Sequence, residues 1–378
     1  MDHLDALARE PMVVRHPGGA LFLSGYSDPE PRLWRSDDDG ATWRRIPVGD
    51  SASGAAGNSD VDLAVGPDGT LYFITMVFDR AALEGVSIQV AASHDTGATW
   101  QWTRLSGTRL ADRPWIEVAP DGTAHAIWND GAGVAHAMST DGGRTWTEGP
   151  RVNPLGGSSH LAVGPNGELA VNVVPLSASG NRFDAGVAFV ATSTDRGATW
   201  TRHPPPGERE WFPMRDTTTT PPTWSLPPQP RWVEPLAFDA AGALYSLWVS
   251  GPAVHLARSA DLGATWTTWQ VAGSEATPFF PYLVARGPGE LAASWFTAGD
   301  SLLAHVAVLR VGTDSTPAVA LAPPFRPESY SPADSSQGDS AGEYLPLVWL
   351  PDGLGVASPI QHPAASRLGF SWRRYRLE

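Results

Sequence analysis

The chain has 378 residues, 42% of them hydrophobic and 17% charged, a balance that excludes an intrinsically disordered protein. The formal net charge of −14, with Arg supplying all 26 basic residues, argues against nonspecific binding to nucleic acid or to an anionic membrane. The absence of Cys excludes disulfides, thiolate metal sites and a Cys nucleophile.

The sequence shows no targeting or membrane signal. No apolar run reaches the ~18 residues that a membrane span requires. The first residues, MDHLDALARE, lack the basic and apolar regions of a signal peptide. We therefore expect a cytoplasmic monomer without membrane or nucleic-acid partners. A mature domain placed behind a new Met would look the same, so a secreted protein stays an alternative.

One eight-residue pattern, S-x-D-x-G-x-T-W, recurs five times. The Asp can accept hydrogen bonds from nearby backbone N–H groups, the Gly can adopt a positive φ, and Thr and Trp suit the start of a strand. Each copy therefore predicts a tight β-turn. The copies are Ser36–Trp43, Ser93–Trp100, Ser139–Trp146, Ser193–Trp200 and Ser259–Trp266.

A second repeat interlocks with the first. An apolar run, a turn of the P-D-G type and another apolar run occur together seven times. The turn glycines are Gly19, Gly69, Gly122, Gly167, Gly242, Gly289 and Gly353. A period of roughly 40–50 residues that holds four short strands is typical of propeller blades. We predict an all-β fold in which residues 1–378 form a single β-propeller domain of seven four-stranded antiparallel blades, with six as the alternative.

Two details of this ring follow from the pattern. The sixth unit has no S-x-D-x-G-x-T-W copy, and Gly312–Ser315 occupies the corresponding place. The seventh unit has three strands of its own, so we expect N-terminal residues near Leu4–Ala8 to supply the fourth and close the ring.

The five turns carry a family resemblance. They resemble the Asp-box, or BNR, repeat, and the chain resembles the Asp-box β-propeller proteins, of which sialidases are the best-known enzymes. The resemblance covers nearly the whole chain and implies the propeller fold. Its implication for activity is weaker, because one fold can host unrelated functions.

Alternation of strand direction places the short turns and the long loops on opposite faces. The P-D-G turns and the repeat turns share one face, here called the lower face, and the longer loops share the upper face. The longest upper insertions are a Pro-rich segment at about 203–233 and a loop at about 322–343. Functional residues concentrate on variable loops carried by a rigid scaffold, so we expect the site on the upper face. The 203–233 segment is either a lid or an inert insertion.

The first residues of the seven innermost strands should line the upper mouth of the central channel. They combine carboxylates, arginines and aromatic rings, which suits a polar ligand with ring faces such as a sugar. These residues are Arg9, Glu10, Asp60, Asp62, Asp112, Arg113, Trp115, His160, Arg231, Trp232, Glu234, Phe280, Tyr282, Glu343 and Tyr344.

The resemblance to sialidases implies catalytic roles for some of them. It implies Tyr344 as nucleophile, Glu234 as its base and Asp60 or Asp62 as the acid/base residue. Arg9 matches the first of three arginines that grip the substrate carboxylate. The second and third are absent from their expected places, so Arg113, Arg231 or Arg286 would have to replace them in space. The other candidate ligand contacts are Trp115, Tyr282, Trp211 and Trp232.

Three functions stay open. The first is a sialidase-like exo-glycosidase, the second a non-catalytic propeller that binds a glycan, peptide or protein, and the third an enzyme of another class, such as a lyase or an enzyme of specialised metabolism. The sequence predicts no cofactor, although Asp60 and Asp62 could bind Ca²⁺ through oxygen ligands. The same carboxylates could instead cap turns, and Tyr282 and Tyr344 could simply fill the channel.

Overall fold

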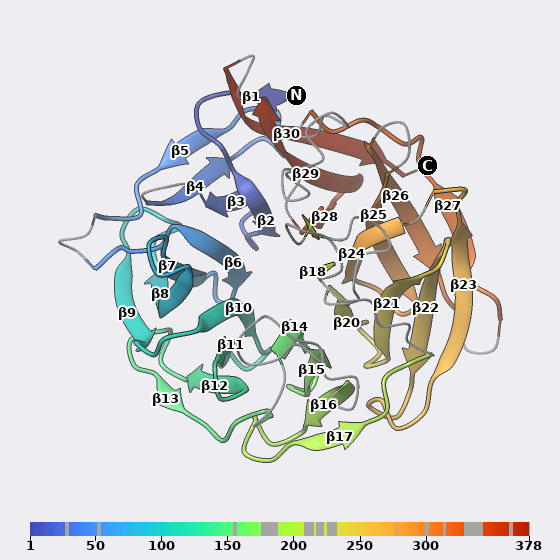
Figure 1. Ribbon diagram of the computed structural model, residues 1–378, viewed down its shortest axis with the longest axis horizontal. Helices are drawn as coiled ribbons and strands as arrows, with labels where there is room; N and C mark the ends of the chain where they lie inside the picture. Colours follow the sequence, from blue (N-terminus) through green and yellow to red (C-terminus); the bar gives the residue numbers. More distant parts are fainter. Residues whose placement is uncertain are drawn as a thin grey trace.

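The structure is a computed structural model that describes residues 1–26, 30–50, 54–153, 157–174, 188–207, 215–216, 223–224, 233–276, 278–298, 302–312, 315–328, 343–362 and 366–377. These ranges contain β-strands and no helix, and hence no helix that could cross a membrane. Figure 1 shows the strands as blades around a central axis, which confirms the predicted all-β propeller.

The described residues form seven four-stranded antiparallel blades, as predicted, so the six-blade alternative is wrong. Blade 1 consists of β2 (Arg9–Arg15), β3 (Leu21–Tyr26), β4 (Pro31–Ser36) and β5 (Arg44–Ile46). Blade 2 consists of β6 (Ser59–Val65), β7 (Leu71–Asp79), β8 (Glu84–Ser93) and β9 (Gln101–Ser106). Blade 3 consists of β10 (Ala111–Val118), β11 (Ala124–Asp130), β12 (Val134–Ser139) and β13 (Thr147–Glu148). Blade 4 consists of β14 (Gly157–Val163), β15 (Leu169–Val174), β16 (Phe189–Ser193) and β17 (Thr201–His203).

The remaining blades follow the same order from the axis outward. Blade 5 consists of β20 (Leu236–Phe238), β21 (Leu244–Ser250), β22 (Ala253–Ser259) and β23 (Thr267–Gly273). Blade 6 consists of β24 (Pro278–Ala285), β25 (Glu290–Ala298), β26 (Leu302–Arg310) and β27 (Ala318–Leu321). Blade 7 consists of β28 (Leu347–Leu350), β29 (Gly353–His362), β30 (Arg367–Arg376) and β1 (Asp2–His3).

The N-terminal residues close the ring. β1 pairs antiparallel with β30, with Asp2 opposite Ser371. The Met1 ammonium group donates to the Trp372 carbonyl at 2.6 Å, and the Trp372 N–H donates to the Met1 carbonyl at 2.8 Å. The closing strand therefore lies just before the expected Leu4–Ala8. Its hydrogen bonds with β30 are made by Met1 and the two residues that follow it.

The five S-x-D-x-G-x-T-W segments form the same hydrogen-bonded turn. In the third copy, the Asp141 carboxylate accepts the Thr145 N–H at 2.9 Å and the Thr145 hydroxyl at 2.6 Å. The Ser139 hydroxyl donates to Asp141 at 2.9 Å and accepts the Gly143 N–H at 2.9 Å. The other four copies repeat these bonds. The turns thus join the third and fourth strands of five blades, as predicted.

Replacing Asp141 with Ala should lower the thermal unfolding midpoint and leave the ligand affinity of the folded protein unchanged. The substitution removes the acceptor of three hydrogen bonds in a lower-face turn, whereas the expected ligand lies on the upper face. Calorimetry and ligand titration measure the two effects. Thr140→Ala, an exposed change in the same turn, is the control. A large loss of affinity at unchanged stability would show that the two faces are assigned the wrong way round.

Part of the 203–233 insertion is described. β18 (Arg215–Asp216) and β19 (Thr223–Trp224) form a two-stranded hairpin in which Arg215 pairs with Trp224. In the chain, β18 and β19 lie between the outer strand of blade 4 and the inner strand of blade 5. In the view of Figure 1, β18 lies near the centre of the ring.

A buried pair of histidines packs between blades 3 and 4. The rings of His125 and His136 stack with centroids 5.4 Å apart, and Nδ1 of His125 lies 3.1 Å from Nε2 of His136. Trp200 of the fourth repeat turn meets His136 edge-on at 5.6 Å. Burial lowers the pKa of His125 to about 3 and that of His136 to about 4, and the charge of His136 lowers the pKa of His125 further.

The unfolding free energy should therefore contain a term that disappears in acid. Unfolded histidines take up protons near their ordinary pKa of 6.5, while the folded pair stays neutral until the pH approaches 4. The stabilising term is present above pH 6.5 and is lost as the pH falls towards 4. Urea unfolding measures the unfolding free energy at about pH 7 and about pH 5. Between these two pH values, it should fall less in His136→Gln than in wild type. The exposed substitution His94→Gln is the control and should behave as wild type. Equal losses in all three proteins would contradict this assignment.

Candidate functional site at the upper channel mouth

A bulge near the start of the inner strand shapes the channel mouth in five blades. Register shifts occur in β2, β6, β10, β14 and β24. Three equivalent bulge residues, Glu10, Arg113 and Phe280, have φ values of 45°, 48° and 48°, and each precedes a Pro. A left-handed backbone costs a non-glycine residue about 1–2 kcal/mol. Strained backbone is concentrated at functional sites, so these residues make the channel mouth a candidate site.

Arg113 is the centre of the mouth. Its side chain is only 9% exposed, and Nη2 lies 3.1 Å and 2.9 Å from the two carboxylate oxygens of Glu343. Nη1 donates to the Tyr344 hydroxyl at 3.5 Å, and Nε lies 4.0 Å from Oδ2 of Asp112. Blade 3 and blade 7 are not neighbours in the ring, so this arginine reaches across the channel.

Two aspartates complete this group. Asp60 accepts the Arg113 N–H at 3.3 Å, so blade 2 contributes a carboxylate beside blade 3. Asp112 precedes Arg113, and its side chain is 39% exposed. We call Asp60, Asp112, Arg113, Glu343 and Tyr344 the mouth cluster. The Asp112 side chain is more exposed than that of Glu343, which is 19% exposed.

The mouth cluster shifts the protonation of its members. Partial burial raises the pKa of Asp112 to about 7 although 39% of its side chain stays exposed; the charge of Asp60 adds to the rise, and the charge of Arg113 opposes it. Burial alone would lower the pKa of Arg113, but Glu343 and the other acidic neighbours hold it well above its usual value. Burial also raises the pKa of Tyr344 well above 10, against the effect of Arg113. Near neutral pH, Asp112 can therefore act as a carboxylic acid while Tyr344 keeps its proton.

A second acidic pair lies deeper in the channel. Asp62 accepts the Leu63 N–H at 2.8 Å and the Ile116 N–H at 2.9 Å, which ties blade 2 to blade 3. Burial raises the pKa of Asp62 to about 7, and burial together with the charge of Asp62 raises that of Glu117 to about 8. Glu117 was not among the predicted rim residues, because it lies further along β10 than the first residues of that strand.

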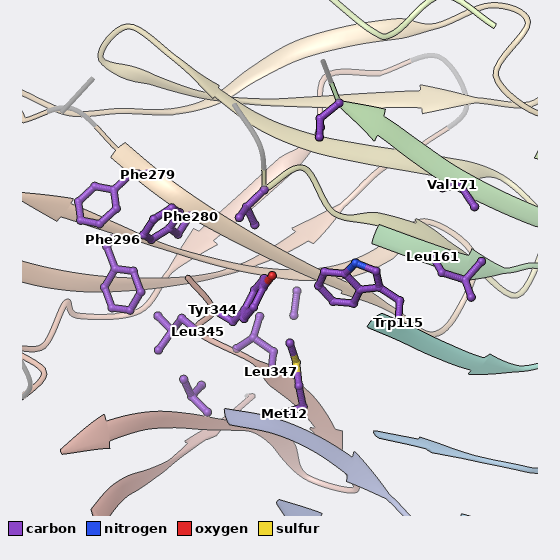
Figure 2. Packing of buried hydrophobic residues seen from close by; sticks show 14 of the residues in the cluster. Met12, Trp115, Leu161, Val171, Phe279, Phe280, Phe296, Tyr344, Leu345 and Leu347 are labelled. Carbon is purple, nitrogen blue, oxygen red and sulfur yellow. The ribbon is translucent and has the colours of Figure 1, made fainter. Parts of the chain in front are cut away.

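Aromatic side chains fill the channel beside these carboxyls. The Trp115 ring lies 5.4 Å from the Tyr344 ring and 5.0 Å from the His160 ring, measured between centroids. The Tyr282 hydroxyl donates to the Met12 sulfur at 3.7 Å. Figure 2 shows Trp115, Tyr344 and Met12 packed in one cluster that draws on several blades. Trp115 and Tyr344 are 4% and 5% exposed, so they form a rigid wall.

The residues proposed as a Tyr–Glu pair have different partners. Tyr344 meets Arg113, as described above. Glu234 is fully buried, and its carboxylate accepts a hydrogen bond from the Asn172 side chain at 3.0 Å. Arg9 lies over the Tyr26 ring, with its guanidinium carbon 5.6 Å from the ring centroid. Arg231, Trp211 and Trp232 lie outside the described residues.

Asp60 and Asp62 direct their carboxylates to backbone N–H groups. The described residues also contain no group of three His, Asp or Glu side chains placed to hold one metal ion. The calcium hypothesis therefore gains no support from this part of the chain.

The mouth cluster joins residues that the sequence placed on the rim but did not connect. Asp112 and Glu343 were rim residues without an assigned role. Arg113 and Glu343 are 230 residues apart in the sequence, and no local sequence pattern predicts that they pair. The available signal was positional, because both residues stand at the start of an innermost strand.

No family model matches the chain, and no curated protein matches its sequence. Solved structures share its fold at low identity. YCF48 from Cyanidioschyzon merolae is 12% identical with a TM-score of 0.53, and the match covers 99% of this chain and 96% of that one. A protein of unknown function from Dyadobacter fermentans is 13% identical with a TM-score of 0.51, covering 100% and 97%.

The structural neighbours include sialidases. Hadza microbial sialidase Hz136 is 17% identical with a TM-score of 0.48, and the match covers 77% of this chain but only 63% of that protein. The shared fold rests on the neighbours with TM-scores of 0.53 and 0.51, and identities this low do not indicate a function. The chain is therefore a seven-bladed propeller whose structural neighbours are sialidase-like and other β-propellers.

Proposed function

We propose that the protein binds a carbohydrate at its upper mouth and hydrolyses a glycosidic bond there, with Asp112 as the proton donor. The position of Asp112 carries the proposal. Its carboxyl stands accessible at the rim, beside a second carboxylate from Asp60 and above a wall that includes Trp115 and Tyr344. Most glycoside hydrolases use a pair of carboxyl residues, and ligand pockets are commonly lined with aromatic side chains.

The chemistry divides between the two aspartates. The Asp112 carboxylic acid donates its proton to the glycosidic oxygen as the bond to the anomeric carbon breaks. A water molecule attacks that carbon, and Asp60 takes the proton that the water releases. The raised pKa of Asp112 supports the first role, because the group holds its proton near neutral pH.

Hydrolysis of the sialidase type through Tyr344 and Glu234 has weaker support. A tyrosine nucleophile must lose its proton to a nearby base. Burial raises the pKa of Tyr344 instead, and its hydroxyl accepts a hydrogen bond from Arg113. The contacts of Tyr344 with Arg113 and Trp115 favour a role in packing beneath the exposed carboxyls.

A hydrolysis assay over a range of aryl glycosides and oligosaccharides tests the proposal. For any substrate that is cleaved, kcat should fall as the pH rises above about 7, since Asp112 then loses the proton it must donate. The expected slope is about tenfold per pH unit on that side. Binding of glycans without cleavage of any would instead favour a non-catalytic propeller. Cleavage with kcat independent of pH between about 6 and about 9 would exclude Asp112 as the acid.

A further inference from the structure

The lower-face turn of the fourth unit differs from its equivalents in one residue that changes its chemistry. Asn166 stands where the second, third and seventh units have Asp68, Asp121 and Asp352, and a glycine follows in all four turns. Of the six asparagines in the chain, Asn166 is the only one that precedes a glycine. The turn joins β14 to β15 and lies on the face opposite the mouth cluster.

An asparagine that precedes a glycine can react with its own backbone. The glycine nitrogen attacks the side-chain carbon Cγ, a C–N bond forms, and the side-chain nitrogen leaves as ammonia, taking the proton that the glycine nitrogen gives up. Water then opens the resulting succinimide ring at either carbonyl, which yields aspartate or isoaspartate. Glycine favours the attack because it has no Cβ to obstruct it and a freely rotating backbone. A carboxylate at the same position, as in Asp68, is a much poorer electrophile.

The structure leaves this pair of residues open to solvent. Asn166 is exposed, and Gly167 has a φ of 84°. Beyond its chain neighbours, no atom of the described residues lies within 4 Å of the place where a Cβ on Gly167 would stand. By contrast, three other asparagines are at most 5% exposed, namely Asn129, Asn153 and Asn172. The amide of Asn58 is held at both ends, since it donates to the Phe78 carbonyl at 3.1 Å and accepts the Phe78 N–H at 2.7 Å.

Glu168 holds the turn in its closed form. Its Oε1 accepts the Asn166 side-chain N–H at 2.8 Å, and its Oε2 accepts the Asn166 backbone N–H at 2.9 Å. Burial raises the pKa of Glu168, but its hydrogen bonds, above all that from the Asn166 side chain, outweigh this effect and hold the pKa below its ordinary value. The Gly167 N–H donates to the Gly164 carbonyl at 3.0 Å. Attack on Cγ therefore requires the turn to open, which an exposed turn can do without unfolding its blade.

We propose that Asn166 is a site of spontaneous covalent modification, at which deamidation yields aspartate or isoaspartate at a rate that Glu168 limits. The modification is independent of the proposed glycoside hydrolysis. It replaces a hydrogen-bond donor to Glu168 with a second carboxylate, so like charges then face each other across the turn. The isoaspartate product also lengthens the backbone between β14 and β15. Neither product returns to asparagine, so modified turns accumulate as the protein ages.

Incubation of the intact protein at mildly alkaline pH, followed by peptide mapping with mass spectrometry, tests the site. The peptide that contains Asn166 should gain the mass of one deamidation before any peptide with another asparagine does. It should also separate chromatographically into aspartate and isoaspartate forms. Asn166→Gln should lose this early product, because the longer side chain would have to form a six-membered ring. Earlier reaction at another asparagine, or an intact Asn166 after every other asparagine has reacted, would overturn the proposal.

A second variant tests the role of Glu168. Glu168→Ala should deamidate at Asn166 about tenfold faster than wild type, because the turn loses the acceptor of two hydrogen bonds and opens more often. Glu290→Ala is the matched control, since Glu290 also follows the turn glycine of its blade but pairs with Arg286. It should leave the rate at Asn166 unchanged. A rate in Glu168→Ala equal to or below that of wild type would overturn the role assigned to Glu168.

Discussion

Asp112→Asn should lower kcat for glycoside hydrolysis by at least about 100-fold, because general acid catalysis contributes roughly 10²–10⁴ to the rate. Asn keeps the size and polarity of the side chain but cannot donate the proton. The unfolding free energy should change little, since the Asp112 side chain is 39% exposed and lies 4.0 Å from the Arg113 guanidinium.

The variant also has a diagnostic pH profile. The fall in kcat above about pH 7 should disappear with the carboxyl. Asp37→Asn, with the same change in charge on the lower face, should retain the wild-type rate and profile. Full activity in Asp112→Asn would remove Asp112 from the mechanism, whatever the substrate.

Arg113→Ala should destabilise the fold by about 3–5 kcal/mol, the usual cost of removing one partner from a buried ion pair. The change leaves the Glu343 carboxylate without its main partner and takes the only cation out of the mouth cluster. It also breaks a tie between blades 3 and 7 across the channel. Urea unfolding gives the free energy, and the slope reports whether the unfolding remains cooperative.

A double-mutant cycle isolates the electrostatic part of this effect. Adding Glu343→Gln to Arg113→Ala should recover part of the lost stability, because the second change removes the charge that faced the Arg113 guanidinium. Additive losses from the two substitutions would mean that the pair does not interact as the geometry indicates. Glu290→Gln, which breaks an exposed pair with Arg286 on the lower face, should cost at most about 1 kcal/mol.

The sequence predicted the ring well because its signals are local. A turn such as Ser139–Trp146 contains every group that its hydrogen bonds need. The glycine spacing then fixed the order of strands and the separation of faces. The closing strand was placed a few residues too late, because the bonds that hold it join Met1 to Trp372 and depend on the opposite end of the chain.

The candidate site was predicted only as a set of rim positions. The structure brings Asp60, Arg113, Trp115 and Tyr344 together, but their pairings follow from the angle between blades. The bulge at Arg113 also turns its side chain across the channel, and a positive φ at a non-glycine residue leaves no clear mark in the sequence. The sialidase-like pairing of Tyr344 with Glu234 rested on resemblance and stays a prediction; among the described contacts, Tyr344 meets Arg113 and Glu234 meets Asn172.

A crystal structure of the Asp112→Asn variant with its tightest-binding oligosaccharide tests the location of the site most directly. The account predicts a sugar ring at the upper mouth, with a glycosidic oxygen within hydrogen-bond distance of the side chain at position 112. A sugar bound in the lower-face turns or on the outer strands, with the mouth cluster untouched, would contradict the account.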